Sequence, residues 1–409
     1  MASKEIPSDK LEEALKHLNS RQRMELDTCA HCALCAETCP AYFESKNLLH
    51  IPGVRSSKVS KLINQSLSRL RIFRGRLAEK NLEELAESAY NCTLCGRCME
   101  ACPFGFQTHE LWVGVRGVLQ DLEKTPSKVR MLSEMLDEFK NPYGLEAETR
   151  LDWVDYTGLE EAPVKDKSKI AYFVGCTTAF KGANQNIAYS ISRVLDYLKE
   201  DWTLLGGEEW CCGSPLLLSG DEDKARDFAE HNTSIIEERG IETLVLGCAG
   251  CFRVFKWEYP KLLGRRPRFK VVHALEYIND RIREGALTPE KYPRRVAYHD
   301  PCELSRLGGV LKEPREILRK ISSSYVELPE HGVDVRCCGG GGLLQAVNND
   351  LRLNIVRHRL NQAISLKVEV LTSACPACKL AFADGVRDLD SSIEVLDITE
   401  LVARQMGLA

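Results

Sequence analysis

The sequence has no long apolar run and no strong excess of charge of either sign. No stretch of about 18 apolar residues occurs along its 409 positions, so we expect no membrane-spanning helix. Residues 1–10 lack the apolar segment of a signal peptide, which predicts a cytoplasmic protein that meets a membrane only through a partner or a surface. The formal net charge of −4 argues against a general nucleic-acid binder. Neither a GxGxxG run nor a Walker lysine is present, so we expect any flavin or nucleotide to be bound by a partner.

Cysteine is abundant by contrast, with 18 residues in the chain. A disulfide scaffold of that density is usually a short secreted domain, whereas this chain is long enough for two or three domains. We therefore expect a reducing compartment and cysteines that bind metal.

Eight of these cysteines form two copies of one motif. Each copy reads Cys-x-x-Cys-x-x-Cys-x-x-x-Cys-Pro, the run that holds two [4Fe–4S] clusters in bacterial ferredoxins. Three closely spaced thiolates can reach three corners of one cubane, while the fourth, before proline, ligates the other cubane. Structural zinc uses four ligands in two pairs and does not need such a run. We assign Cys29, Cys32, Cys35 and Cys102 to the first cubane cluster and Cys92, Cys95, Cys98 and Cys39 to the second.

The segment between the two motifs predicts a helix over 59–77 and an acidic helix over 82–90. It has no acidic residue between Glu44 and Glu79. Its basic residues are Lys46, Arg55, Lys58, Lys61, Arg69, Arg71, Arg74 and Arg76. They are either a solvated helix face that offsets the anionic clusters, or a docking patch for an acidic electron-transfer partner or for anionic lipid headgroups.

Apolar periodicity predicts three more helices around the motifs, over 11–26, 111–122 and 129–139. We therefore expect a helical ferredoxin domain over 1–140. A polar, proline-bearing stretch over 141–168 is interpreted as a loop-like linker.

From residue 169 onward, predicted strands alternate with predicted helices, which is typical of an α/β unit with a parallel sheet. The pattern occurs twice, and we define a first module over 169–290 and a second module over 291–409. The overall prediction is an α+α/β fold, with a helical two-cluster ferredoxin domain followed by two duplicated α/β modules.

Each module carries five of the remaining cysteines in the same order: a single cysteine, an adjacent pair followed by glycine, and a CxxC. The sets are Cys176, Cys211, Cys212, Cys248 and Cys251 in the first module and Cys302, Cys337, Cys338, Cys375 and Cys378 in the second. The single cysteine and the CxxC follow predicted strands, so we expect all five at one rim of each sheet.

Five thiolates cannot pair completely in disulfides, and both zinc and a cubane need only four. The set suits a cluster with more terminal ligand sites than a cubane offers. The glycine run 339–342 would let the backbone approach such a bulky group without Cβ clashes.

In its motifs and their order, the chain resembles the CCG-domain iron–sulfur oxidoreductases, over residues 25–404. The order of the whole chain resembles the D-type subunit of heterodisulfide reductase, and the same layout occurs in the iron–sulfur subunits of glycolate and lactate oxidases. The resemblance implies that each five-cysteine set holds one noncubane [4Fe–4S] cluster. It also implies that the two clusters face each other and that a disulfide is cleaved between them, one sulfur at each.

One position departs from the family pattern His-Asp-Pro-Cys-His. Here the run is His299-Asp300-Pro301-Cys302-Glu303. The missing histidine puts the disulfide chemistry in question, unless this position merely faces solvent. His299 and Asp300 either tune the cluster potential through hydrogen bonds or cap a helix.

The sequence leaves several functions open. The favoured one is an electron-transfer subunit that passes electrons through two cubane clusters to two noncubane clusters. The alternatives are a catalytic thiol–disulfide reductase subunit, the iron–sulfur subunit of a 2-hydroxy-acid dehydrogenase, and a zinc-stabilised scaffold. The expected partners are redox subunits, either a flavoprotein or a membrane cytochrome or quinone-reactive subunit.

Overall fold

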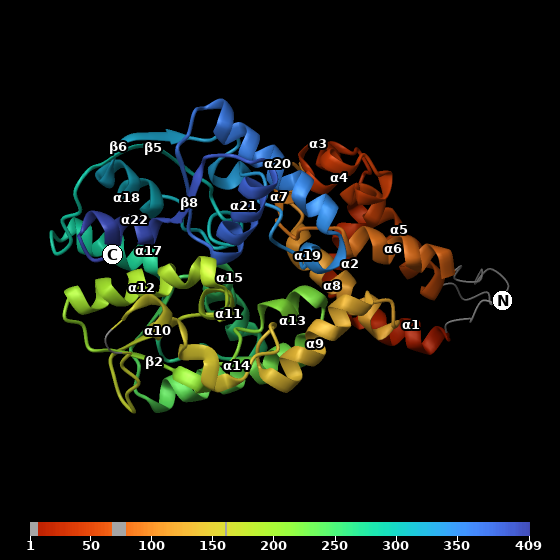
Figure 1. Ribbon diagram of the computed structural model, residues 1–409. Coiled ribbons are helices and arrows are strands. Elements are labelled where there is room, and N and C mark those ends of the chain that lie inside the picture. The colour runs from red at the N-terminus through yellow and green to blue at the C-terminus, as the bar shows by residue number, and fades with distance from the viewer. Residues whose placement is uncertain (1–6, 68–78, 160–161) are drawn as a thin grey trace. The chain divides into compact units, whose positions relative to one another are not determined.

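The computed structural model describes residues 7–67, 79–159 and 162–409 (Figure 1). The chain divides into two compact units, each built from separate segments. The first unit comprises Met1–Met131, Pro215–Glu222 and Gly339–Ile355, and the second comprises Leu132–Ser214, Asp223–Cys338 and Val356–Ala409. The domain boundaries given above stay a prediction, because these units are discontinuous in sequence.

Helices alone form the secondary structure of the first unit's described residues. They are α1 (Ser8–Ala14), η1 (Leu15–His17), α2 (Ser20–Thr28), α3 (Leu34–Thr38), α4 (Pro40–Ser45), η2 (Leu48–His50), α5 (Pro52–Leu67), α6 (Glu79–Tyr90), α7 (Arg97–Glu100), α8 (Thr108–Asp121), the start of α9 (Ser127–Phe139), α13 (Ser214–Ser219), α19 (Leu344–Val347) and the start of α20 (Asn349–Ser365). Its core joins Leu85 of α6 and Trp112 of α8 to Leu218 of α13. Residues that follow the cysteine pairs in sequence therefore complete the core around the ferredoxin motifs.

The single helix predicted over 11–26 is wrong, because α1 and η1 end before α2 begins. The side chain of Asn19 accepts a hydrogen bond from the Gln22 amide at 3.0 Å, and the Gln22 side chain accepts one from the Asn19 amide at 2.9 Å. This capping box starts a new helix inside a stretch whose apolar spacing is continuous.

The predicted basic patch is only partly described, since Arg69, Arg71, Arg74 and Arg76 lie outside the described residues. Arg55 is fully buried and donates to the hydroxyl and the carbonyl of Ser88 at 3.1 and 2.6 Å. Lys58 forms an ion pair with Glu84. Arg55 is therefore part of the interior and belongs to neither a solvated face nor a docking patch.

The second unit contains two four-stranded sheets, and every neighbouring pair of strands is parallel. The strand orders are β2-β1-β3-β4 and β6-β5-β7-β8. The strands are β1 (Ile170–Phe173), β2 (Trp202–Leu204), β3 (Thr243–Leu246), β4 (Lys270–His273), β5 (Tyr292–Tyr298), β6 (Ser322–Glu327), β7 (Val370–Ser373) and β8 (Glu394–Asp397). The predicted parallel α/β organisation is confirmed. The edge strands β2, β4, β6 and β8 were not predicted; β2 has only three residues, and β6 begins with three serines.

Helices connect these strands in each module. They are η3 (Ala147–Leu151), α10 (Trp153–Thr157), α11 (Cys176–Phe180), α12 (Gly182–Tyr197), η4 (Gly206–Glu208), α14 (Glu222–Glu238), α15 (Ala249–Arg253), the π-helix η5 (Val254–Glu258), α16 (Tyr259–Leu262), α17 (Ala274–Arg283), α18 (Glu313–Ile321), η6 (Gly332–Asp334), α21 (Pro376–Asp388) and α22 (Ile398–Gln405). The predicted linker is partly helical, because η3 and α10 lie within it. Trp153 of α10 is fully buried in the same core as Tyr172 of β1, so this stretch belongs to the first module's core. Within the described ranges, no helix has the length and apolar character needed to cross a bilayer.

Candidate functional site

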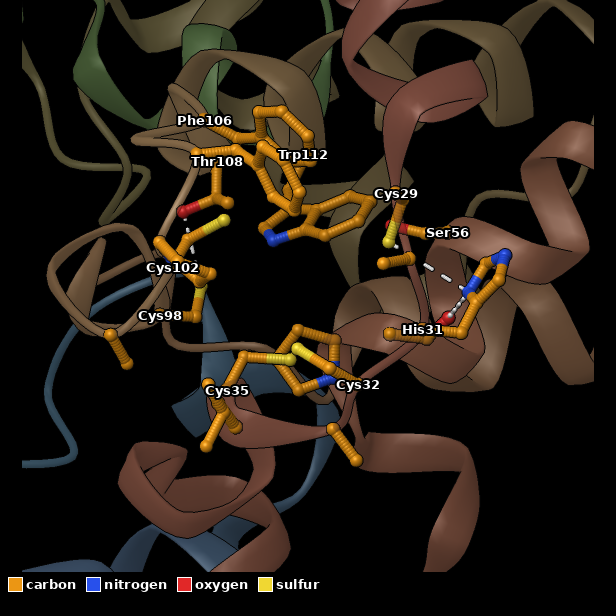
Figure 2. A pocket seen from close by; sticks show the side chains of 18 residues that line it. Cys29, His31, Cys32, Cys35, Ser56, Cys98, Cys102, Phe106, Thr108 and Trp112 are labelled. Atoms are coloured by element: carbon orange, nitrogen blue, oxygen red, sulfur yellow. Dashed lines mark hydrogen bonds between the residues drawn. The ribbon is translucent and has the colours of Figure 1, made fainter.

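The four cysteines assigned to the first cubane line one cavity of the first unit. The cavity measures about 480 Å³, including space open to solvent, and Figure 2 shows Cys29, Cys32, Cys35 and Cys102 around it. Cys98 lines the same cavity. The predicted pairing of the first three cysteines of one motif with the last cysteine of the other is thus geometrically possible.

The second ferredoxin set is also gathered in space. Burial raises the pKa of Cys39, and the nearby thiols of Cys92 and Cys98 raise it further. Burial, with contributions from Cys92 and Cys95, raises the pKa of Cys98 to about 12. The four thiols therefore lie close enough to repel one another as thiolates, and a bound cationic centre would relieve that repulsion.

The backbone of both motifs turns the same way between the cysteines. His31 and Ala33 have φ values of 49° and 61°, and the corresponding Leu94 and Gly96 have values of 52° and 71°. Left-handed residues are rare outside glycine and cluster where a loop must expose its amides. Such turns build the amide nests that bind anionic groups, including iron–sulfur clusters.

In the second unit, each single cysteine and each CxxC follows a central strand. Cys176 begins α11 after β1, and Cys248 precedes α15 after β3. Cys302 follows β5, and Cys375 precedes α21 after β7. The predicted placement at the carboxyl ends of strands is confirmed for all four.

The five thiols of the first module form a chain of contacts. The thiol contacts run from Cys176 to Cys211, then to Cys212, Cys251 and Cys248. Hydrogen bonds from Cys211 and Cys251 lower the pKa of Cys212, while the neighbouring thiols have raised pKa values. Five buried thiols in contact are a donor set for a thiophilic metal.

The second module brings its cysteines together in a similar way. The Sγ atoms of Cys338 and Cys378 are 3.1 Å apart, and Cys378 in turn contacts Cys375. Cys302 and Cys337 are buried as well. Cys375 also contacts Cys248, so the two five-cysteine sets lie next to each other within the second unit.

A buried ion pair between Arg150 and Glu209 lies beside Cys176, and the sequence did not predict it. The Arg150 guanidinium donates to Glu209 at 2.8 Å and to the Cys176 Sγ at 3.5 Å. Glu209 accepts from the amides of Val174 and Gly175, both at 2.9 Å. Arg150 belongs to η3 in the expected linker, so no motif pointed to it. The pair fixes the strand-to-helix turn and places a positive charge beside a predicted cluster ligand.

A comparable network orders the loop before Cys302. Asp300 is fully buried and accepts two hydrogen bonds from Arg315, at 2.7 and 2.9 Å, and one from the Gly332 amide at 2.9 Å. It therefore ties the loop before Cys302 to α18 and to the start of η6. Burial, and then the charge of Arg359, lowers the pKa of His299 to about 3, so its ring is uncharged at neutral pH.

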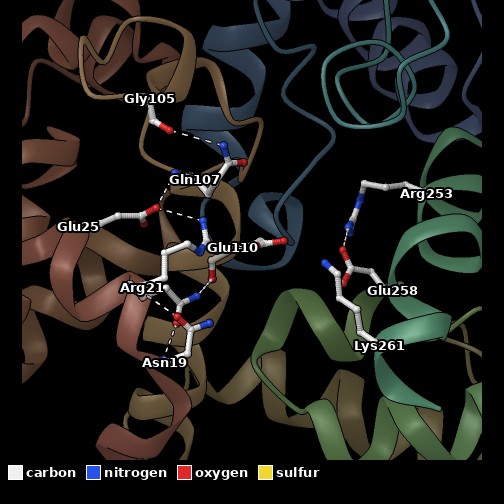
Figure 3. Close-up of polar contacts among 10 residues, drawn as sticks. Asn19, Arg21, Glu25, Gly105, Gln107, Glu110, Arg253, Glu258 and Lys261 are labelled. Carbon is white, nitrogen blue, oxygen red and sulfur yellow. Dashed lines mark hydrogen bonds and ion pairs between the residues drawn. The ribbon is translucent and has the colours of Figure 1, made fainter. Parts of the chain in front are cut away.

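Glu303, the residue that departs from the family pattern, does not face solvent freely. It forms an ion pair with Arg253, which is buried and follows Cys251 by two residues. Arg253 also pairs with Glu258 at 2.5 Å (Figure 3). Glu303 thus links the ligand regions of the two modules.

In the first unit, Glu25 holds the loop that follows Cys102. Its carboxylate accepts from Arg21 at 3.0 Å and from the Gln107 amide at 3.2 Å (Figure 3). The contact fixes the segment between the second motif and α8.

Two family models match the chain in the expected order. Residues 25–106 match the 4Fe-4S dicluster domain, and residues 170–256 and 296–383 match the cysteine-rich CCG domain. Over 403 residues the chain is 36% identical to the D-type subunit of the dihydromethanophenazine:CoB–CoM heterodisulfide reductase of Methanosarcina acetivorans, covering 96% of this chain and 97% of that protein. The chain belongs to the family of D-type heterodisulfide reductase subunits.

Two further similarities are more distant. The EtfAB:quinone oxidoreductase of Syntrophomonas wolfei is 25% identical, with 96% of this chain and 60% of that protein aligned. A crystal structure of a hypothetical protein from Helicobacter pylori has a TM-score of 0.60 at 11% identity, covering 98% of this chain and 77% of that one, which shows a shared fold.

As a member of this D-type family, the chain is an iron–sulfur protein with an electron-transfer role. Its donor atoms fit iron–sulfur clusters. All 18 cysteines are free of disulfides, and most are buried. Such sulfur-rich sets select iron–sulfur clusters or other thiophilic metals.

Proposed function

We propose that the chain is the electron-transfer subunit of a heterodisulfide-reductase-like redox complex, with two cubane and two noncubane [4Fe–4S] clusters. The observation that carries the proposal is the contact between Cys248 and Cys375, because it joins two five-thiol sets on one compact unit. The ferredoxin-type sets on the same chain supply an entry for electrons. When bound, such clusters exchange electrons one at a time.

The ligand sets are the four-cysteine and five-cysteine groups predicted above. A four-thiol set satisfies a cubane, and the cavity around Cys29, Cys32, Cys35 and Cys102 supports that assignment. A chain of five mutually contacting thiols, such as that from Cys176 to Cys248, has one donor more than a cubane uses. This excess supports the noncubane assignment for both modules.

A buried arginine with glutamate partners adjoins the five-thiol sets at two places. Arg150 lies beside Cys176, and Arg253 follows Cys251. Glu209 compensates the charge of Arg150, and Glu258 and Glu303 compensate that of Arg253, so these groups add no net positive charge beside the clusters. Their part in the proposal is to hold the ligand loops in place.

The proposed partners are a flavoprotein and a membrane cytochrome or quinone-reactive subunit. The sequence has no nucleotide-binding motif, so a two-electron donor would need a flavin on another chain. The names of the two relatives, one a dihydromethanophenazine:CoB–CoM heterodisulfide reductase subunit and the other an EtfAB:quinone oxidoreductase, are compatible with such partners.

A second candidate function is disulfide reduction at the same place. The contact of Cys248 with Cys375 brings the two proposed clusters near each other, which would let each receive one sulfur of a disulfide. Two electrons would then cleave the S–S bond to two thiolates, which take up two protons from solvent. Identity to a heterodisulfide reductase subunit over nearly the whole chain favours this candidate.

Anaerobic purification of the full chain tests the proposal. Four clusters require about sixteen iron and sixteen sulfide per chain, whereas two cubanes alone would give about half of that and would overturn the noncubane assignment. Electron paramagnetic resonance with added dithiol under oxidising conditions separates the two functions. A thiol-dependent cluster signal supports disulfide chemistry, and its absence in fully loaded protein supports a relay.

A further inference from the structure

His299 is a buried histidine next to the cysteines of the second module. Its side chain is 1% exposed, and its ring nitrogen lies with the Sγ atoms of Cys338 and Cys378 in a group whose atoms are all within 4.8 Å of one another. The ring follows β5 directly and precedes Cys302 by three residues. A polar group in this position faces the ligands of the proposed second noncubane cluster.

The orientation of the ring is fixed by Arg359. Its Nε donates a hydrogen bond to Nδ1 of His299 at 3.2 Å. Arginine is only a donor, so Nδ1 must be the acceptor and carry no proton. Arg359 is itself held by the carbonyl of Pro329 and by the Gln362 side-chain oxygen, the latter at 2.6 Å.

The proton of the ring therefore lies on Nε2. This atom is buried and has no hydrogen-bond partner among the described residues. A protonated Nε2 has no lone pair for iron, so His299 is not a sixth ligand in this tautomer. It is a buried N–H donor that has no acceptor among the described residues.

The duplicated module supplies an internal comparison. Phe173 precedes Cys176 by three residues, as His299 precedes Cys302. Phe173 packs edge-on against Phe255, with ring centroids 4.9 Å apart and an interplanar angle of 69°. His299 packs edge-on against Phe382, with ring centroids 4.8 Å apart and an interplanar angle of 78°. Both partners follow their CxxC by four residues. The second module keeps the aromatic packing and adds one N–H group, so packing alone does not explain the histidine.

We propose that His299 donates a hydrogen bond from Nε2 to a sulfur of the second module's cluster and raises the reduction potential of that cluster. This inference rests on the proposed function, since it needs a cluster in the second five-cysteine set. A hydrogen bond to cluster sulfur stabilises the more negative reduced form. One electron enters the cluster, and the proton stays on Nε2 throughout. His299 is a positioning and tuning residue for electron transfer.

The test compares H299F with H299Q in the anaerobic full chain. H299F installs the residue that the first module has, while H299Q keeps an N–H donor. Cluster midpoints are read by redox titration followed by electron paramagnetic resonance, with iron and sulfide content measured on each sample. F173L serves as the matched control, because it alters the equivalent ring in the first module.

In H299F, we expect the midpoint potential of one noncubane cluster to become more negative. At its wild-type midpoint, the ratio of reduced to oxidised cluster should fall about tenfold, which equals 59 mV for one electron. The other three midpoints should stay unchanged, H299Q should retain most of the wild-type value, and F173L should leave the His299-sensitive cluster unaffected.

Two results would overturn the inference. One is an unchanged set of midpoints in fully loaded H299F. The other is selective loss of one cluster in H299F and in H299Q alike, which would mark His299 as an iron ligand or a purely structural residue. A wild-type protein that carries only the two cubanes would instead overturn the proposed function.

Discussion

The guanidinium of Arg116 donates from Nη2 to the carbonyl oxygen of Cys92 at 2.8 Å, inside the first unit. The same side chain donates to Ala89 at 2.9 and 3.1 Å, to Leu218 at 2.6 Å and to Gly342 at 3.0 Å. All four acceptors are backbone carbonyls. Leu218 lies shortly after the first adjacent cysteine pair in the sequence, and Gly342 shortly after the second. Arg116 therefore connects both of these segments to the loop that contains Cys92, a proposed cubane ligand.

Substitution of Arg116 should be among the most damaging single changes in the chain. R116Q leaves several buried carbonyls without a donor, and we expect unfolding free energy to fall by about 3 kcal/mol or more. Anaerobic denaturant titration measures the loss. R268Q is the control, because the Arg268 side chain is 84% exposed, and its change should stay within about 0.5 kcal/mol. A loss below about 1 kcal/mol in R116Q would contradict the assigned role.

Gly342 should tolerate no side chain. It has a φ of 63°, and a Cβ atom there would overlap the carbonyl of Cys92 and the backbone of Thr93. We expect G342A to lower the thermal unfolding midpoint and to release iron from the second ferredoxin set. Backbone strain alone would cost about 1 kcal/mol.

The matched control for this prediction is G309A. Gly309 also has a positive φ, 82°, but a Cβ atom there would meet nothing within 4 Å. G309A thus measures strain without a clash. If both variants lose the same stability and keep full iron content, the close approach of Gly342 to Cys92 is not what the glycine provides.

These contacts indicate where sequence reasoning reached its limit. The strands that end at Cys176, Cys248, Cys302 and Cys375 could be predicted, because apolar runs and motif spacing are local signals. The glycine run 339–342 was expected to admit a bulky cluster, and the sequence did not predict that Gly341 and Gly342 lie against the Cys92–Thr93 backbone. Arg116 and Arg150 bind groups that are far away in the sequence. A single arginine in a helix has no local sequence pattern from which such partners could be predicted.

Stability should depend on pH through Asp397, which caps α22. Burial raises the pKa of this carboxyl to about 7, against about 3.9 in an unfolded chain. Between these values the folded state binds the extra proton, so stability falls as pH rises from 4 to 7. The full difference corresponds to about 4 kcal/mol at most.

The variant that tests this is D397N. In the wild type the Thr399 amide donates a hydrogen bond to the Asp397 carboxylate at 2.9 Å, and the side-chain oxygen of asparagine can accept the same bond. We expect the unfolding free energy of D397N minus that of the wild type to increase between pH 4 and pH 7 and then to level off. A difference that is flat with pH would show that Asp397 is already ionised at low pH in the folded protein.

Glu303 should act as a structural counter-ion. Its carboxylate is paired with Arg253; Glu303 follows Cys302 directly, and Arg253 follows Cys251 by two residues, so the pair joins proposed cluster ligands of different modules. Removing one partner of a buried ion pair leaves an uncompensated charge, so E303Q should lose about 3 kcal/mol of stability, moderated by the remaining pair of Arg253 with Glu258. E284Q is the control, since Glu284 pairs with Arg281 at an exposed site and its loss should cost less than about 1 kcal/mol.

The same variant separates a structural role from a catalytic one. The Glu303 carboxylate is engaged by Arg253, so E303Q should keep the same response to dithiol and to disulfides as the wild type, once cluster content is matched. The histidine of the family pattern could donate a proton at this position, and E303H tests whether such a donor changes disulfide turnover. If E303Q loses disulfide reduction while its stability and iron content equal those of the wild type, Glu303 supplies a proton to the reaction, and its pairing with Arg253 must then open during turnover.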